Sequence, residues 1–137
     1  MTSLVVLDNE AVQALRHQHH PRHRQVVSHV QVVTDRKRRG VAIELAVPTA
    51  VRVEAGWDRI SAAWAFPNRL RIADESLDRS AANSAATIRQ QTDVSVADAH
   101  LGAVIKATPA EEVTVVTSDP QDIRKVAEGR RVIIIAI

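Results

Sequence analysis

Two acidic residues in this sequence directly follow short apolar runs. Leu4 to Leu7 lead into Asp8, and Val113 to Val116 are followed three residues later by Asp119. Continuous apolar runs of this length are typical of strands that are covered on both faces in a parallel sheet. If the two strands are neighbours, both carboxylates lie at the sheet edge where α/β proteins bind ligands. The alternative for each Asp is an ordinary cap on the next helix.

Two further acids are notable for their helical register. Asp98 lies four residues after Val94 and three before Leu101, on the apolar face of a predicted helix. Glu54 lies three residues after Val51 and three before Trp57, so we expect it to point along the apolar stripe of an earlier helix. A buried carboxylate is costly unless it has a partner, a proton or a metal ion. A structural ion pair could account for either acid alone.

The four acids together suggest a metal site. Hard divalent cations prefer oxygen ligands, and Mg²⁺ is typically held by a few carboxylates with water completing its coordination. Two strand-end acids and two helix acids in one small domain could converge on one edge of the sheet. The sequence does not fix the strand order on which this convergence depends.

The elements that must position these acids alternate between strand and helix. Such alternation predicts an α/β fold with a central, mostly parallel sheet of about five strands. The predicted strands are Leu4–Leu7, Val41–Val47, Arg69–Ile72, Val113–Thr117 and Val132–Ile137. The predicted helices are Asn9–Arg16, Arg22–Arg38, Thr49–Trp64, Glu75–Gln91, Asp93–Ala107 and Pro120–Glu128, with Thr49, and Asp93 or Ser95, as possible N-caps.

Composition narrows the class of protein. The 137 residues suit a single domain, and 45% apolar residues suit a packed core. The absence of cysteine excludes disulfides and thiolate metal sites and is compatible with a cytoplasmic location. We expect no signal peptide and no membrane span. Of the 18 basic residues only three are lysines, Lys37, Lys106 and Lys125, and the others are arginines. Because Arg binds phosphate as a planar fork, this excess favours a nucleic-acid partner. A bias toward Arg codons is the alternative explanation.

Four segments resemble motifs of one family, in order and spacing. They are LVVLDNEAV, VPTAVRVEAGW, VSVADAHLGAVI and VTVVTSDPQDI. The chain resembles the PIN-domain ribonucleases, most closely the VapC-type toxins of bacterial toxin–antitoxin pairs, over nearly its whole length. The resemblance implies a single PIN domain over residues 1–137, folded as a three-layer α/β/α sandwich.

The resemblance also implies a site and an activity. Asp8, Glu54, Asp98 and Asp119 match the metal-binding and catalytic acids, which hold Mg²⁺ or Mn²⁺ for hydrolysis of RNA phosphodiester bonds. Thr117, Asn9 and Asp122 match supporting positions; the family commonly has Thr or Ser where this chain has Asn9. The implied protein is a cytoplasmic endoribonuclease toxin that forms a homodimer and is inhibited by a cognate antitoxin.

Other functions remain open at this stage. A PIN-like nuclease could act in RNA processing without a toxin role, and a degenerate module could bind nucleic acid without cleaving it. A phosphate-accepting receiver domain also has acids at strand ends and binds Mg²⁺. The receiver domain needs an Asp on a middle strand and a late Lys, whereas here the second strand closes with Pro48 and no Lys follows the last strand.

Three remaining features have ordinary explanations. We expect the His-rich stretch from His17 to Arg24 to be a solvated helix connection, since its spacing fits no standard zinc motif. Arg38 and Arg39 end a predicted helix, where cations suit the helix dipole, and a phosphate contact with RNA is the sharper alternative. We expect Trp57 and Trp64 to pack in the core or a subunit interface.

Overall fold

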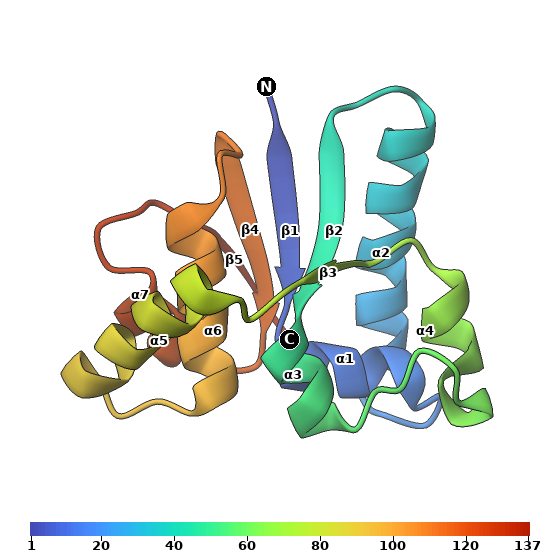
Figure 1. Cartoon of the computed structure of the whole chain (residues 1–137). Coiled ribbons are helices and arrows are strands. Elements are labelled where there is room, and N and C mark those ends of the chain that lie inside the picture. Colours follow the sequence, from blue (N-terminus) through green and yellow to red (C-terminus); the bar gives the residue numbers. More distant parts are fainter.

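The central feature of the structure, a computed structural model that describes residues 1–137, is a five-stranded parallel sheet (Figure 1). Its strands lie in the order β3-β2-β1-β4-β5. They are β1 (Ser3–Leu7), β2 (Ile43–Pro48), β3 (Ala73–Glu75), β4 (Glu112–Thr117) and β5 (Ile133–Ala136). The parallel α/β architecture predicted from the sequence is confirmed, and β1 and β4 are indeed neighbours, with Leu7 opposite Val116.

Seven α-helices and one short 3₁₀ helix surround the sheet. They are α1 (Asn9–Arg16), α2 (His23–Arg38), α3 (Thr49–Ala55), η1 (Ala62–Trp64), α4 (Ala65–Arg69), α5 (Arg79–Gln91), α6 (Val96–Ala107) and α7 (Pro120–Val126). Helices α1, α2 and α4 lie on one side of the sheet, and α5, α6 and α7 lie on the other (Figure 1). None of these helices has the length and apolar character needed to cross a membrane.

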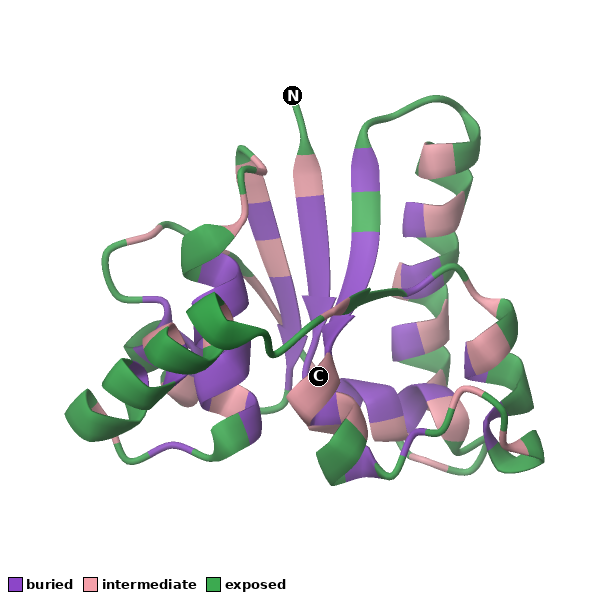
Figure 2. Ribbon diagram, viewed as in Figure 1, coloured by how far each residue is buried: buried purple, intermediate pink, exposed green.

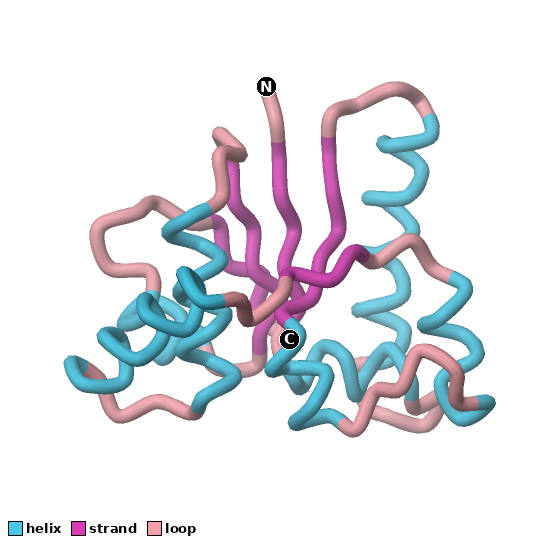
Figure 3. The backbone as a smooth tube through the Cα atoms, viewed as in Figure 1, coloured by secondary structure: helices cyan, strands magenta, loops and turns pink.

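The strand side chains divide between two apolar cores. Val5, Leu7 and Leu45 face α1 and α2, whereas Leu4 and Val6 face α6. Because both faces are covered, most of β1, β2 and β4 is buried (Figure 2), which explains their apolar runs. Figure 3 shows the strands converging at their carboxyl ends, close to the beginning of α3. Asp8 and Asp119 follow β1 and β4 at this edge of the sheet.

The predicted helix Thr49–Trp64 begins at Thr49 as expected but ends at Ala55, and Thr49 is its first residue rather than its N-cap. Helix α3 ends at Ala55 because Gly56 adopts the left-handed conformation, with φ of 73°. The chain then turns so that Trp57 stacks on Trp64 with ring centroids 5.5 Å apart. Both indoles are almost fully buried, which confirms their predicted place in the core.

Three other elements begin three or four residues later than predicted. The third strand is Ala73–Glu75 rather than Arg69–Ile72, because α4 occupies Arg69 and the strand pairs with β2 only from Ala73 onward. Helix α5 begins four residues later than predicted, at Arg79, where the Asp78 carboxylate accepts a hydrogen bond from the Ala81 N–H at 2.9 Å. Helix α6 begins at Val96, and Ser95 rather than Asp93 is its cap.

The His-rich connection is held to α1 at two points. The His20 ring contacts the Glu10 carboxylate, with 2.5 Å between Nε2 and Oε1. The His23 Nδ1 lies 2.8 Å from the carbonyl oxygen of Ala14. His17 and His19 are exposed, as expected of a solvated connection.

Candidate metal site at the carboxyl edge of the sheet

Asp8 is a buried carboxylate that joins the ends of β1 and β4. It caps α1, where its Oδ1 accepts a hydrogen bond from the Ala11 N–H at 2.8 Å. Its Oδ2 accepts a second bond from the Ser118 N–H at 3.2 Å, just beyond β4. Only 6% of Asp8 is exposed, and this burial raises the pKa of its carboxyl, while the Thr117 hydroxyl and the two N–H donors act in the opposite direction. Asp8 therefore caps α1, and its burial disfavours the ionised form of its carboxyl group.

The end of β4 presents two acids with different surroundings. Asp119 is exposed and caps α7, with its Oδ1 accepting from the Asp122 N–H at 3.1 Å. Its own N–H donates to the Oγ1 of Thr117 at 2.9 Å, so the buried Thr117 fixes this turn. Asp122 is half-buried in the first turn of α7.

Asp98 lies half-buried in the first turn of α6, near Asp8 and Asp122. The pKa of its carboxyl is raised from 3.8 to about 6, first by burial and then by the charges of Asp8, Asp122 and Glu54. The Ser95 side chain opposes this rise. The predicted apolar face is partly present, since Leu101 is fully buried one turn later. The raised pKa shows that the acids are close enough to repel one another.

Glu54 does not point into the core, contrary to the sequence prediction. Because α3 ends at Ala55, Trp57 is outside the helix and no apolar stripe continues past Glu54. The Glu54 side chain is exposed, beside Val53, which is 82% exposed. It still contributes to the raised pKa of Asp98, so it reaches the same region of the surface.

We call Asp8, Glu54, Asp98 and Asp122 the acidic edge. No Lys, Arg or His side chain lies within 4 Å of the carboxylates of Asp8, Glu54, Asp98 or Asp119; Asp122 is 3.5 Å from Lys125. Three of the four members therefore lack a cationic partner within the chain. This is unusual for Asp8 and Asp98, since buried and half-buried carboxylates usually have a cationic partner. A divalent cation would relieve that repulsion.

The acidic edge is not an assembled coordination site. No three His, Asp or Glu side chains are placed to hold one metal ion together. The donor types fit Mg²⁺ or Mn²⁺, but the side chains would have to rotate toward one another to bind it. The Oδ1 of Asn9, next to Asp8 in sequence, is buried and has no hydrogen-bond donor, so it could accept a bond from a water of hydration.

Sequence reasoning missed His100, which is fully buried on α6 two residues after Asp98. Its Nδ1 accepts a hydrogen bond from the Ala50 N–H in α3 at 3.3 Å, which ties the helix of Glu54 to the helix of Asp98. Burial lowers the pKa of the His100 ring, which favours its neutral form. A His in an otherwise apolar helix segment was the only signal in the sequence.

Arg38 and Arg39 lie far from the acidic edge. Both are at the end of α2, whose chain continues into the amino end of β2, whereas the acids lie at the carboxyl ends of the strands. They are exposed, and Arg38 makes only a 3.6 Å contact with Asp35. A phosphate contact there would lie near the amino end of β2, at the opposite end of the strand from the acids.

The architecture is shared with a known structure. The crystal structure of FitAcB from Neisseria gonorrhoeae matches 94% of this chain and 96% of its own, with a TM-score of 0.55 and 16% sequence identity. At this identity the match shows the fold alone. No protein-family model and no curated protein matches the sequence. The protein thus has a five-stranded parallel α/β fold, consistent with the PIN-like sandwich that its motifs predict.

Proposed function

We propose that this protein is a metal-dependent endoribonuclease of the toxin–antitoxin type, with its active site at the acidic edge. The observation that carries the proposal is the position of half-buried Asp98 near Asp8, Asp122 and Glu54, with no Lys, Arg or His side chain within 4 Å of its carboxylate. The raised pKa of Asp98 supports it, since groups with a perturbed pKa mark candidate functional sites. The four PIN-like motifs and the PIN-like fold support the same reading.

Asp8, Asp98 and Glu54 would be the main residues that hold Mg²⁺ or Mn²⁺. Once bound, the ion supplies an activated water and a counter-charge for the phosphodiester. Asp8 keeps a fixed position because both of its carboxylate oxygens are hydrogen-bonded. Glu54 is exposed on the last turn of α3 and can swing toward the other acids.

The two late acids differ in their surroundings, and we assign them different roles. Asp119 matches the family motif, but its carboxylate caps α7 and it is not among the charges that raise the pKa of Asp98. Asp122 is among them. We therefore propose that Asp122 contributes to metal binding, and that Asp119 and Thr117 hold the turn that carries it.

A homodimer is part of the proposal, and an exposed apolar surface supports it. Val53, Leu77 and Val96 are 82%, 39% and 50% exposed, and they line a shallow pocket of about 480 Å³ beside Glu54. Exposed apolar patches of this kind often mark protein interfaces. A second copy on this surface would enclose the acidic edge from one side, and an antitoxin would inhibit by placing a basic residue among the acids.

The experiment is cleavage of total RNA by the purified protein with Mg²⁺ or Mn²⁺, in parallel with EDTA. Asp98→Asn is the test variant, and Glu111→Gln is the control, because Glu111 is an exposed acid just before β4, at the opposite edge of the sheet. We expect metal-dependent cleavage that is lost in Asp98→Asn and retained in Glu111→Gln. Absence of both cleavage and Mn²⁺ binding by calorimetry would refute the proposal.

Two alternatives are separated by further results. Cleavage without an inhibitory protein partner would favour a nuclease of RNA processing. Mn²⁺ binding without cleavage of any RNA would favour a non-catalytic binding module.

A further inference from the structure

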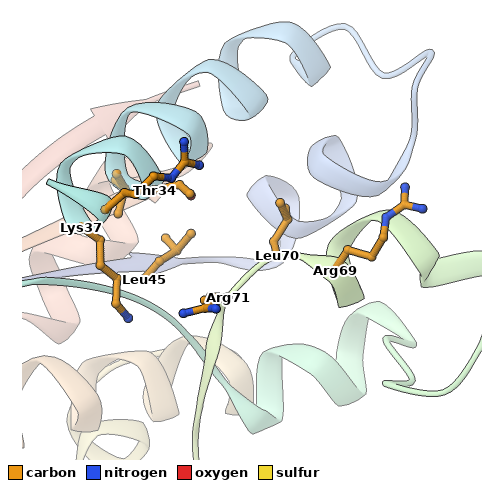
Figure 4. A pocket seen from close by; sticks show the side chains of 8 residues that line it. Thr34, Lys37, Leu45, Arg69, Leu70 and Arg71 are labelled. Atoms are coloured by element: carbon orange, nitrogen blue, oxygen red, sulfur yellow. The ribbon is translucent and has the colours of Figure 1, made fainter.

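A pocket apart from the acidic edge lies between α2 and the segment that leads into β3. It is a pocket of about 550 Å³ on the α2 side of the sheet (Figure 4). Its lining consists of Val33, Thr34, Lys37, Arg38, Leu45, Arg69, Leu70 and Arg71, which we call the basic pocket. None of these residues belongs to the acidic edge, and no acidic residue is part of the lining.

The pocket exists because β3 is short. This strand pairs only with Ala46 to Pro48, so the amino half of β2 has no neighbouring strand at this edge. Leu45 is therefore covered by α2 on its face of the sheet but is open toward the missing strand. Val33 and Leu45 are 9% and 4% exposed and form an apolar floor.

The chain from α4 to β3 supplies the other wall. Leu70 is extended, with φ of −82° and ψ of 150°, and alternate residues of an extended chain point to opposite sides. Leu70 and Ile72 accordingly pack against the core, whereas Arg69 and Arg71 are exposed. In Figure 4 the charged ends of Lys37 and Arg71 lie toward one end of the pocket, and Arg69 extends from the other.

Two of the four cations are unpaired. Lys37 is bound to Glu44 at 2.7 Å, and Arg38 has a loose contact with Asp35. Arg69 and Arg71 have no acidic group within 4 Å and donate no side-chain hydrogen bond. Their spacing across an apolar floor suits a ligand with both anionic and flat apolar parts.

We infer that the basic pocket binds a short segment of single-stranded RNA. Arg69, Arg71 and Arg38 would hold phosphates as planar forks, and a base would lie on the floor formed by Leu45 and Leu70. The inference rests on the proposed function, which makes RNA the polyanion this protein must hold. Leu45 is three residues, roughly 10 Å, before the carboxyl end of β2, so a bound RNA strand that continued along β2 would run toward the sheet edge that carries the acids.

The inference is tested by RNA binding in a chain that does not cleave. Binding of a fluorescein-labelled 12-nucleotide RNA to Asp98→Asn protein in EDTA is measured by anisotropy between 50 and 200 mM salt. The test variant adds Arg69→Ala and Arg71→Ala. The control adds Arg22→Ala and Arg79→Ala, which remove the same charge from exposed sites outside the pocket.

Loss of two phosphate contacts should reduce the slope of log affinity against log salt by about 1.4 and weaken binding about tenfold at 100 mM salt. The control should change much less. Leu70→Ala should weaken binding without changing the slope, because it removes an apolar contact and no charge. The melting temperature of each variant is measured to check that it is folded.

Equal weakening in the test and control variants would overturn the inference, as would unchanged affinity in the test variant. Binding of a Glu- and Leu-rich peptide that depends on Arg69 and Arg71, with RNA binding unaffected, would assign the pocket to an acidic protein segment instead. Cleavage by the unmodified protein separates the two proposals. Cleavage with pocket-independent binding refutes only the pocket, and pocket-dependent binding without cleavage refutes only the nuclease.

Discussion

Asp98→Asn should stabilise the metal-free protein at neutral pH. The folded-state pKa of Asp98 is about 6, against an ordinary value of 3.8, so protonation of this carboxyl favours the fold. That contribution is fully present below about pH 4 and is lost as the pH rises to about 6. At pH 7.5 the ionised carboxylate therefore bears its whole penalty. An Asn at position 98 has no charge and avoids it.

The size of the effect follows from the same pKa. A rise from 3.8 to about 6 corresponds to at most about 3 kcal/mol. Asp98 is only half-buried, and solvent screening reduces this figure to about 1 kcal/mol. For a chain of 137 residues, this difference raises the melting temperature by about 3–5 °C.

The assay is thermal unfolding of both proteins at pH 4 and pH 7.5, first in EDTA and then with Mn²⁺. In EDTA the variant should melt higher than the unmodified protein at pH 7.5 and at nearly the same temperature at pH 4. Mn²⁺ should reverse the order at pH 7.5, since a ligand at a hundred times its Kd stabilises by about 2.7 kcal/mol and the variant lacks a ligating carboxylate. A variant that melts lower at pH 7.5 in EDTA, or equally higher at both pH values, would refute the repulsion among the acids.

Three further predictions follow from particular contacts. Asp122→Asn should lower the pKa of Asp98, measured by NMR titration, whereas Asp119→Asn should leave it unchanged, because only Asp122 is among the charges that raise it; equal effects would contradict their separate roles. Asp8→Ala should cost about 1–3 kcal/mol in urea unfolding, because it removes the α1 cap and the acceptor for the Ser118 N–H; an unchanged midpoint would show that these bonds are unimportant. Gly102→Ala should also cost about 1–3 kcal/mol, because its Cβ would lie 2.7 Å from the Cβ of Val126 on α7; a neutral effect would mean that α7 can move away from α6.

The sequence alone predicted the layout of this protein because its signals are local. Apolar runs and helical periodicity depend only on residues within a few positions of one another along the chain. They place four of the five strands and most helices within a few residues of their observed bounds. The acids at Asp8 and Asp98 were also visible, one by its place after a strand and the other by its register on a helix. Boundaries failed where a single backbone conformation decided them, as at Gly56, whose left-handed turn ends α3 and leaves Glu54 exposed.

Only the tertiary structure decided which acids act on one another. Asp8 and Asp98 are 90 positions apart in the chain, and their repulsion depends on the β1–β4 pairing and on the docking of α6, neither of which is encoded in local pattern. The hydrogen bond from the Ala50 N–H to the buried His100 ring also joins residues that are far apart in the chain, so no local pattern predicts it. The basic pocket likewise lies where β3 stops pairing with β2, since the pairing begins only at Ala46 and leaves the edge of β2 beside Leu45 without a neighbouring strand. Local sequence patterns determine the helices and strands, whereas long-range packing determines which charged groups those helices and strands bring together.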